Sequence, residues 1–138
     1  MRIAIAALAL ATAASCAGDG VLPTEGGGVP SGPTLASLQS SIFTPRCAVD
    51  GCHAGTDPQQ GLDLSGGESF AHLVGVPSTE LAEFDRVSPG SSADSYVLMK
   101  LLGDPRIAGS QMPLIGPALE PVEIDALRRW IDAGAKND

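Results

Sequence analysis

Two stretches without hydrophobic periodicity, residues 54–68 and 105–119, most strongly constrain how this chain can fold. The first is dominated by Gly, Asp, Pro and Gln, and both separate short segments that have helical spacing. The chain has three Phe, one Tyr and one Trp against 17 Gly and 11 Pro, so its side chains supply little bulk for a core. Loops this long in a small domain need something to pack on.

The remaining segments predict an all-α domain of three to four helices joined by long loops. Apolar residues at helical spacing and capping residues define these segments. The predicted helices run from an N-cap at Thr34 through Leu35, Leu38 and Ile42 to Pro45, over Ser69 to Val74, from a cap at Ser92 to Leu102 before Gly103, and from Pro121 through Ile124, Leu127 and Ile131 to Gly134.

The N-terminal segment is typical of export. Residues 1–15 have a basic residue, an apolar run and small residues before Cys16, and the run is too short to span a bilayer. The segment resembles the lipobox of bacterial lipoproteins, in which the cysteine becomes a lipidated N-terminus, and an ordinary secretory signal is the alternative. Residues 16–34 are a flexible Gly/Pro linker, and residues 35–138 form the domain. The net charge of −8 argues against a nucleic-acid partner.

The sequence Cys47-Ala48-Val49-Asp50-Gly51-Cys52-His53 is the most informative motif. Covalent attachment of c-type haem needs two thiols for the vinyl groups and an imidazole that binds the iron. The usual spacing is C-x-x-C-H, and here it is C-x4-C-H. The two extra residues must bulge out, and Asp50-Gly51 favours such a turn because Gly51 tolerates positive φ.

A second iron ligand is expected downstream of the motif. Met112 is the best candidate because it lies in an aperiodic loop and a thioether binds haem iron well. Met99 lies among apolar residues and is interpreted as packing, whereas His72 is the alternative ligand and would give a bis-His iron of lower potential. A haem would also supply the apolar body that the two long loops lack.

These features resemble the c-type cytochrome superfamily, and most closely the small monohaem domains of exported bacterial lipoproteins. The resemblance covers about residues 35–135. It rests on the segment from Ile42 to Cys47, on Cys52-His53, on Arg86 to Gly90 with Ser95 to Leu101, on Met112-Pro113 and on Glu123 to Ala135. It implies a class I cytochrome c-like fold, thioethers at Cys47 and Cys52, a proximal His53 and a distal Met112.

The implied function is one-electron transfer in the cell envelope by a single covalent haem c, not enzymatic catalysis. Peroxidase-like activity would require a labile distal ligand. The acidic domain favours a redox protein with a basic docking surface. Lipidation of Cys16 would hold the protein on a membrane, on the periplasmic side or at the cell surface.

Two haem-free readings of the motif stay open. In an exported protein Cys47 and Cys52 are candidates for a disulfide, which would make the chain a binding or structural lipoprotein domain. A zinc site from Cys47, Cys52, His53 and His72 is possible by ligand count. Asp50, Asp57 and Asp63 lack the Gly and Glu positions of a calcium hand, and no catalytic triad or carboxylate pair stands out.

Overall fold

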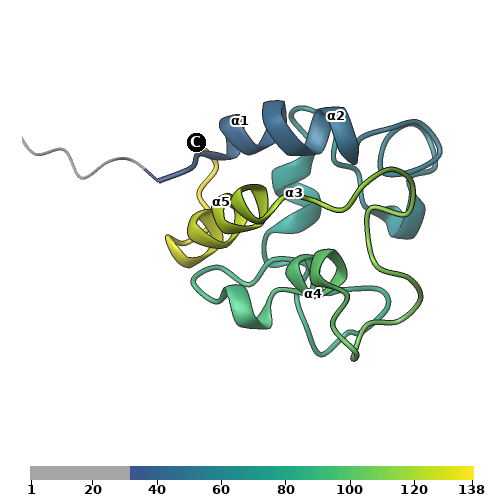
Figure 1. The fold of residues 1–138 in the computed structure, drawn as a ribbon. Coiled ribbons are helices and arrows are strands. Elements are labelled where there is room, and N and C mark those ends of the chain that lie inside the picture. Colours follow the sequence, from purple (N-terminus) through teal and green to yellow (C-terminus); the bar gives the residue numbers. More distant parts are fainter. Residues whose placement is uncertain (1–31) are drawn as a thin grey trace, which may run out of the picture.

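The computed structural model describes residues 32–138. The signal segment predicted for residues 1–15, Cys16 and nearly all of the linker predicted for residues 16–34 lie outside the described residues. The described part is helical with isolated bridges and no strand, which confirms the all-α prediction (Figure 1). No helix in it is long and apolar enough to cross a membrane.

Four helical regions carry the fold. The first consists of three consecutive pieces, and two single 3-10 turns lie within the loops. In chain order the elements are α1 (Leu35–Leu38), the π-helical η1 (Gln39–Phe43), α2 (Thr44–Arg46), the 3-10 turn η2 (Gln59–Gly61), α3 (Ser69–Leu73), the 3-10 turn η3 (Ser92–Asp94), α4 (Tyr96–Leu102) and α5 (Pro121–Asp132).

The first helical region begins where the sequence indicates. Thr34 is the N-cap, and its side chain accepts a hydrogen bond from the backbone N–H of Ser37 while the Ser37 hydroxyl receives one from Thr34. The π segment was not predicted. It precedes Pro45, which has no N–H for an ordinary helical bond, so the ladder widens there. The helix ends at Arg46, directly before the first cysteine of the motif, as predicted.

The predicted cap of the third helix is wrong. Ser92 starts the 3-10 turn η3, and α4 begins at Tyr96, with Ser95 at its N-cap. The reason is tertiary, because the Ser92 backbone N–H and hydroxyl both donate to the carboxylate of Asp132 at the end of α5. The predicted stop is confirmed, since Gly103 ends α4 with a φ of 68°.

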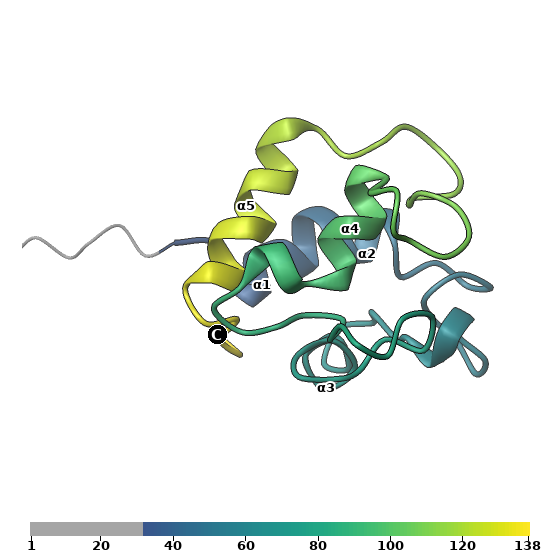
Figure 2. The same ribbon diagram turned by 90° about the horizontal axis from the view of Figure 1, so that it is seen from below.

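The last helix packs against the first, and both views show α5 beside α1 (Figures 1 and 2). Asp138 joins them, because its backbone C=O accepts from Ala36 N–H at 2.9 Å and its carboxylate from Leu35 N–H at 2.9 Å. Apolar side chains from all four regions form one core. Its buried members are Leu35, Leu38, Ile42, Phe43, Leu64, Leu73, Val87, Leu98, Leu101, Leu119, Ile124, Leu127, Trp130, Ile131 and Ala135.

Buried basic side chains fasten the long loops to this core. The Arg86 guanidinium donates to the backbone C=O groups of Gln60 at 2.6 Å and His72 at 2.8 Å, which ties the first loop to α3. Lys100 on α4 donates to the C=O of Ala108 at 2.7 Å and pairs with Glu80 at 3.0 Å. The loops therefore find polar anchors that the hydrophobic pattern does not reveal.

Replacing Gly103 by alanine tests the junction between α4 and the second loop. A Cβ at this positive φ would lie 2.9 Å from Oε1 of Gln111, whose amide donates to the C=O of Leu101. We expect Gly103→Ala to lower the free energy of unfolding by about 1–2 kcal/mol and Tm by about 5–15 °C, measured by circular dichroism. Gly66→Ala, with open space around its Cβ, is the control. Equal melting of the two variants would contradict the strain argument.

Candidate functional site

The motif from Cys47 to His53 forms a closed turn. The N–H of His53 donates to the C=O of Cys47 at 3.2 Å, and the N–H of Cys52 donates to the C=O of Val49 at 2.9 Å. Gly51 has a φ of 78°, which the sequence analysis anticipated for the spacer. The four-residue spacer therefore bulges and returns, so that the backbones of Cys47 and His53 meet despite the longer spacing.

Both cysteines of the turn are free thiols, and both are half-buried. Burial raises the pKa of Cys47 to about 11, although the neighbouring Arg46 lowers it. This thiol is protonated at neutral pH, and the thiolate is the form that attacks a disulfide sulfur. The folded turn thus holds Cys47 as a partly buried apolar group against the core.

His53 has the protonation state that an iron ligand needs. Burial lowers its pKa, and nearby backbone groups of Leu62 and Gln59 offset this effect in part. The ring is therefore neutral at pH 7. Its Nδ1 is buried and makes no hydrogen bond within residues 32–138, so one nitrogen of the imidazole is enclosed by protein. A neutral imidazole is the form that ligates a metal ion, through the ring nitrogen that carries no proton.

Met112 lies in the second loop and is half-buried against the hydrophobic core. Its backbone N–H donates to the C=O of Lys100 at 2.9 Å, so α4 fixes the start of this segment. In both views the loop from 105 to 119 and the turn after α2 lie at the same end of the molecule, away from Asp138 (Figures 1 and 2). Met99, by contrast, is buried on α4, which confirms its interpretation as packing.

Arg46 connects the turn to the loop of Met112, and sequence reasoning missed it. Its Nη1 pairs with Glu123 Oε2 at 2.7 Å, and its Nη2 donates to the C=O groups of Pro117 at 2.6 Å and Ala118 at 3.1 Å. The end of the second loop and the first turn of α5 therefore meet at the residue before Cys47. Every residue has a backbone C=O, so the sequence does not indicate which carbonyl groups the Arg46 guanidinium binds.

His72, the alternative ligand, lies on α3 and has other partners. Its Nδ1 is 3.1 Å from the C=O of Gly61, and its Nε2 is 3.8 Å from a carboxylate oxygen of Glu68 one helical turn earlier. Both ring nitrogens thus face groups of the first loop and of α3 itself.

No three His, Cys, Asp or Glu side chains within residues 32–138 gather where they could hold a metal ion. This arrangement gives the zinc reading of the motif no support. His72 is engaged with Gly61 and Glu68 and does not complete a four-ligand set with the two thiols and His53.

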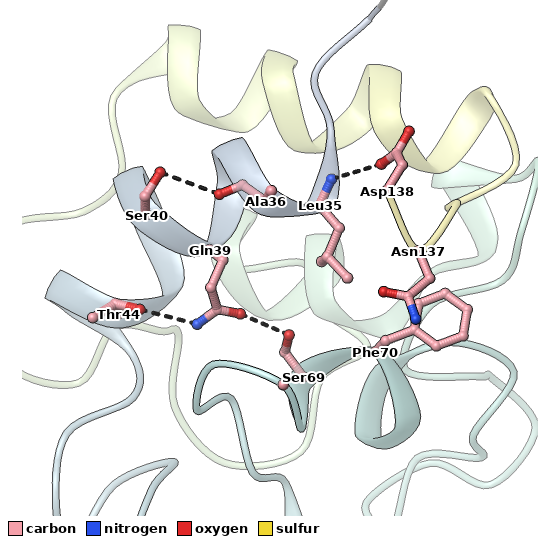
Figure 3. Close-up of a pocket in the computed structure, with 10 residues that line it drawn as sticks. Leu35, Ala36, Gln39, Ser40, Thr44, Ser69, Phe70, Asn137 and Asp138 are labelled. Carbon is pink, nitrogen blue, oxygen red and sulfur yellow. Dashed lines mark hydrogen bonds between the residues drawn. The ribbon is translucent and has the colours of Figure 1, made fainter.

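A hollow of about 560 Å³ lies elsewhere, between the first helical region, α3 and the C-terminal residues (Figure 3). Its central polar side chain, Gln39, donates to Thr44 at 3.0 Å and accepts from Ser69 at 2.7 Å. Phe70 and Asn137 line it on the side away from Thr44 (Figure 3). None of the candidate ligands lines it, so this hollow is separate from the Cys47–His53 turn.

The chain matches no protein-family model, no curated protein and no solved structure in comparisons of each kind. The turn, the loop of Met112 and the residues that connect them are therefore the features of this chain that bear on its function.

Proposed function

We propose that this chain is a monohaem c-type cytochrome with a class I cytochrome c-like fold that transfers single electrons in the cell envelope. The observation that carries the proposal is the closed turn of two free thiols and a neutral His53 with an enclosed Nδ1. A disulfide-bonded structural turn gives no role to the imidazole beside Cys52, whose Nδ1 is buried without a hydrogen bond among the described residues, whereas iron ligation does.

Four side chains would hold the haem. Cys47 and Cys52 would form the thioethers, His53 would be the proximal ligand and Met112 the distal ligand. When bound, haem c supplies a one-electron Fe(III)/Fe(II) couple whose potential depends on the axial ligands, burial and nearby charge. His53 and Met112 together would keep the coordination the same in both oxidation states, so little rearrangement would accompany electron transfer.

The chain itself contributes positioning and exclusion of water. Arg46 fixes the turn relative to the segment after Met112, and Lys100 binds Met112 through its C=O and the preceding Ala108 through its Nζ. Half-buried apolar side chains from the Cys47–His53 turn, the first loop, α4 and the second loop pack on the core. They would shield a bound group from solvent. They include Cys47, Leu62, Val97 and Met112.

Met112 is favoured over His72 as the distal ligand because its thioether has no competing polar partner. His72 would have to give up contacts to Gly61 and Glu68 to bind iron. Stable Met112 ligation also closes the position that a peroxide would need, which favours an electron carrier over an enzyme.

The proposed partner is a redox protein with a basic docking surface, because the chain carries a net charge of −8. The proposed location is the envelope of a bacterial cell, with lipidated Cys16 as the membrane anchor on the periplasmic side or at the cell surface.

An absorption spectrum of the exported chain tests the proposal. The chain is produced in a host with cytochrome c maturation, and spectra are taken oxidised, dithionite-reduced and as the pyridine haemochrome. We expect a reduced α-band at ~550 nm that persists after denaturation, and a weak oxidised band at ~695 nm from the Met112 sulfur. Absence of covalent haem, when a control cytochrome is loaded in the same host, would refute the proposal and leave an exported haem-free domain.

A further inference from the structure

Glu80, Tyr96 and Lys100 form a polar cluster against the second loop, and we call these three residues the α4 clamp. Tyr96 and Lys100 lie one helical turn apart on α4 and are buried. Glu80 comes from the chain between α3 and α4, and its carboxylate accepts from the Tyr96 hydroxyl at 2.9 Å and pairs with Lys100 Nζ at 3.0 Å. A lysine is almost never buried without a paired charge, so Glu80 stabilises Lys100 in this position.

The α4 clamp holds Ala108 of the second loop by both of its backbone groups. The Ala108 N–H donates to Tyr96 Oη at 3.1 Å, and the Ala108 C=O accepts from Lys100 Nζ at 2.7 Å. At the next residue, Gly109, a Cβ would lie 3.8 Å from Lys100 Nζ, so the loop passes directly over the ammonium group. The N–H of Met112 then donates to the C=O of Lys100 at 2.9 Å. Lys100 therefore binds both ends of the segment from Ala108 to Met112.

The directions of these hydrogen bonds make the other two residues of the α4 clamp depend on Glu80. Burial raises the pKa of Tyr96 and so does Glu80, although the N–H of Ala108 acts in the opposite direction, and the hydroxyl keeps its proton at neutral pH. The hydroxyl gives that single proton to Glu80, which leaves its oxygen free to accept from Ala108. Loss of the Glu80 charge would remove this acceptor and the counter-ion of Lys100 together, so both bonds to Ala108 would weaken.

We infer that Glu80 is a positioning residue for Met112. Through Tyr96 and Lys100 it holds the segment that ends at Met112 on α4, and it thereby sets how often the Met112 sulfur leaves the distal position. Glu80 acts through its two partners on α4 and not as a ligand itself. The inference rests on the proposed function, because it takes Met112 as the distal ligand.

Imidazole binding to the haem-loaded exported chain tests the role of Glu80. Imidazole binds at the distal position only while Met112 is displaced, so its apparent Kd falls as the open fraction rises. Glu80→Gln keeps the size of the side chain and removes its charge. We expect this variant to lower the apparent Kd of imidazole at least about tenfold, because hydrogen bonds to charged groups are lost. Its oxidised band at ~695 nm should weaken as well.

Glu83→Gln is the matched control. Glu83 belongs to the same segment as Glu80, is exposed, and its replacement changes the net charge by the same amount. A lone surface charge has little effect on stability, so this variant should change the apparent Kd of imidazole less than about twofold.

Two further variants test the path from Glu80 to the loop. Tyr96→Phe and Lys100→Met each remove one of the two bonds to Ala108, and each should lower the apparent Kd of imidazole. Glu80→Gln combined with Tyr96→Phe should change Kd by less than the product of the two single effects, because both variants weaken the same bond. Tyr96→Phe removes one oxygen atom and keeps the ion pair, so it carries the test if Glu80→Gln does not fold.

Amide hydrogen exchange gives a readout that does not depend on iron. In Glu80→Gln the amides of Ala108 and Met112 should exchange at least about tenfold faster than in the parent chain, because the segment between them opens more often. The amide of Leu127, in the core on α5, reports on global unfolding and should keep its rate, since the opening is local.

Two results would overturn the inference. A lower Tm with unchanged imidazole affinity in Glu80→Gln or Tyr96→Phe would show that the α4 clamp only stabilises the fold, and equal changes in Glu83→Gln would show an effect of net charge. The haem spectrum of the parent chain separates this inference from the proposed function. Haem with unchanged imidazole affinity refutes the role of Glu80 alone. Absence of haem refutes the proposed function and with it a ligand role of Met112, and the amide exchange then decides whether Glu80 holds the loop.

Discussion

A chain with serine at both Cys47 and Cys52 is expected to lose all covalently bound haem and to melt well below the parent protein. Thioether bonds need both sulfur atoms, and serine keeps the size of the side chain without supplying them. Loss of a large apolar group from the loop side of the core should cost on the order of 3–5 kcal/mol, as removal of a large buried aromatic side chain does. Tm should fall by about 20 °C in a domain of this size.

Haem staining after denaturing electrophoresis measures attachment, and circular dichroism measures melting. Cys16→Ser is the control, because it removes the one cysteine outside the turn and should keep the full haem content. Under the disulfide reading, the parent chain would carry no haem, and reducing it would bring its melting to that of the double serine variant. Cooperative unfolding of the double serine variant at nearly the parent's stability would show that the loops need no haem to pack.

Met112→Leu is expected to keep covalent haem but to lose the weak band near ~695 nm and to lower the reduction potential. Leucine fills a similar volume and cannot ligate iron, so the loop stays packed while the distal ligand is lost. Axial ligands move haem potentials over a span of ~0.8 V, and we expect a fall of about 0.1–0.3 V. Potentiometric titration followed by absorbance measures it, and added imidazole should bind at the opened position.

Met99→Leu is the matched control, because Met99 is a buried core residue on α4 and its replacement should leave spectrum and potential unchanged. His72→Asn tests the alternative ligand. If Met112→Leu keeps the parent spectrum and His72→Asn changes it, then His72 is the distal ligand and the thioether of Met112 is core packing.

Sequence patterns located the helices of this protein because the relevant interactions are local. Thr34 caps through a residue three positions away, Gly103 stops α4 by its own φ, and Pro121 opens α5 from its first position. The apolar faces at helical spacing gave Leu38, Ile42, Leu127 and Ile131, all of which lie in the core. The turn at Gly51 followed equally from the conformational freedom of one residue.

The connections between distant segments came only from the tertiary structure. Arg46 binds the C=O groups of Pro117 and Ala118, Arg86 binds those of Gln60 and His72, and Ser92 is drawn to Asp132 instead of capping α4. Any residue offers the same backbone acceptor, so sequence does not record which carbonyl a buried guanidinium will meet. The sequence thus identified the residues of the candidate site. The neutral state of His53 and the burial of Cys47 depend on contacts with distant segments, which only the folded chain creates.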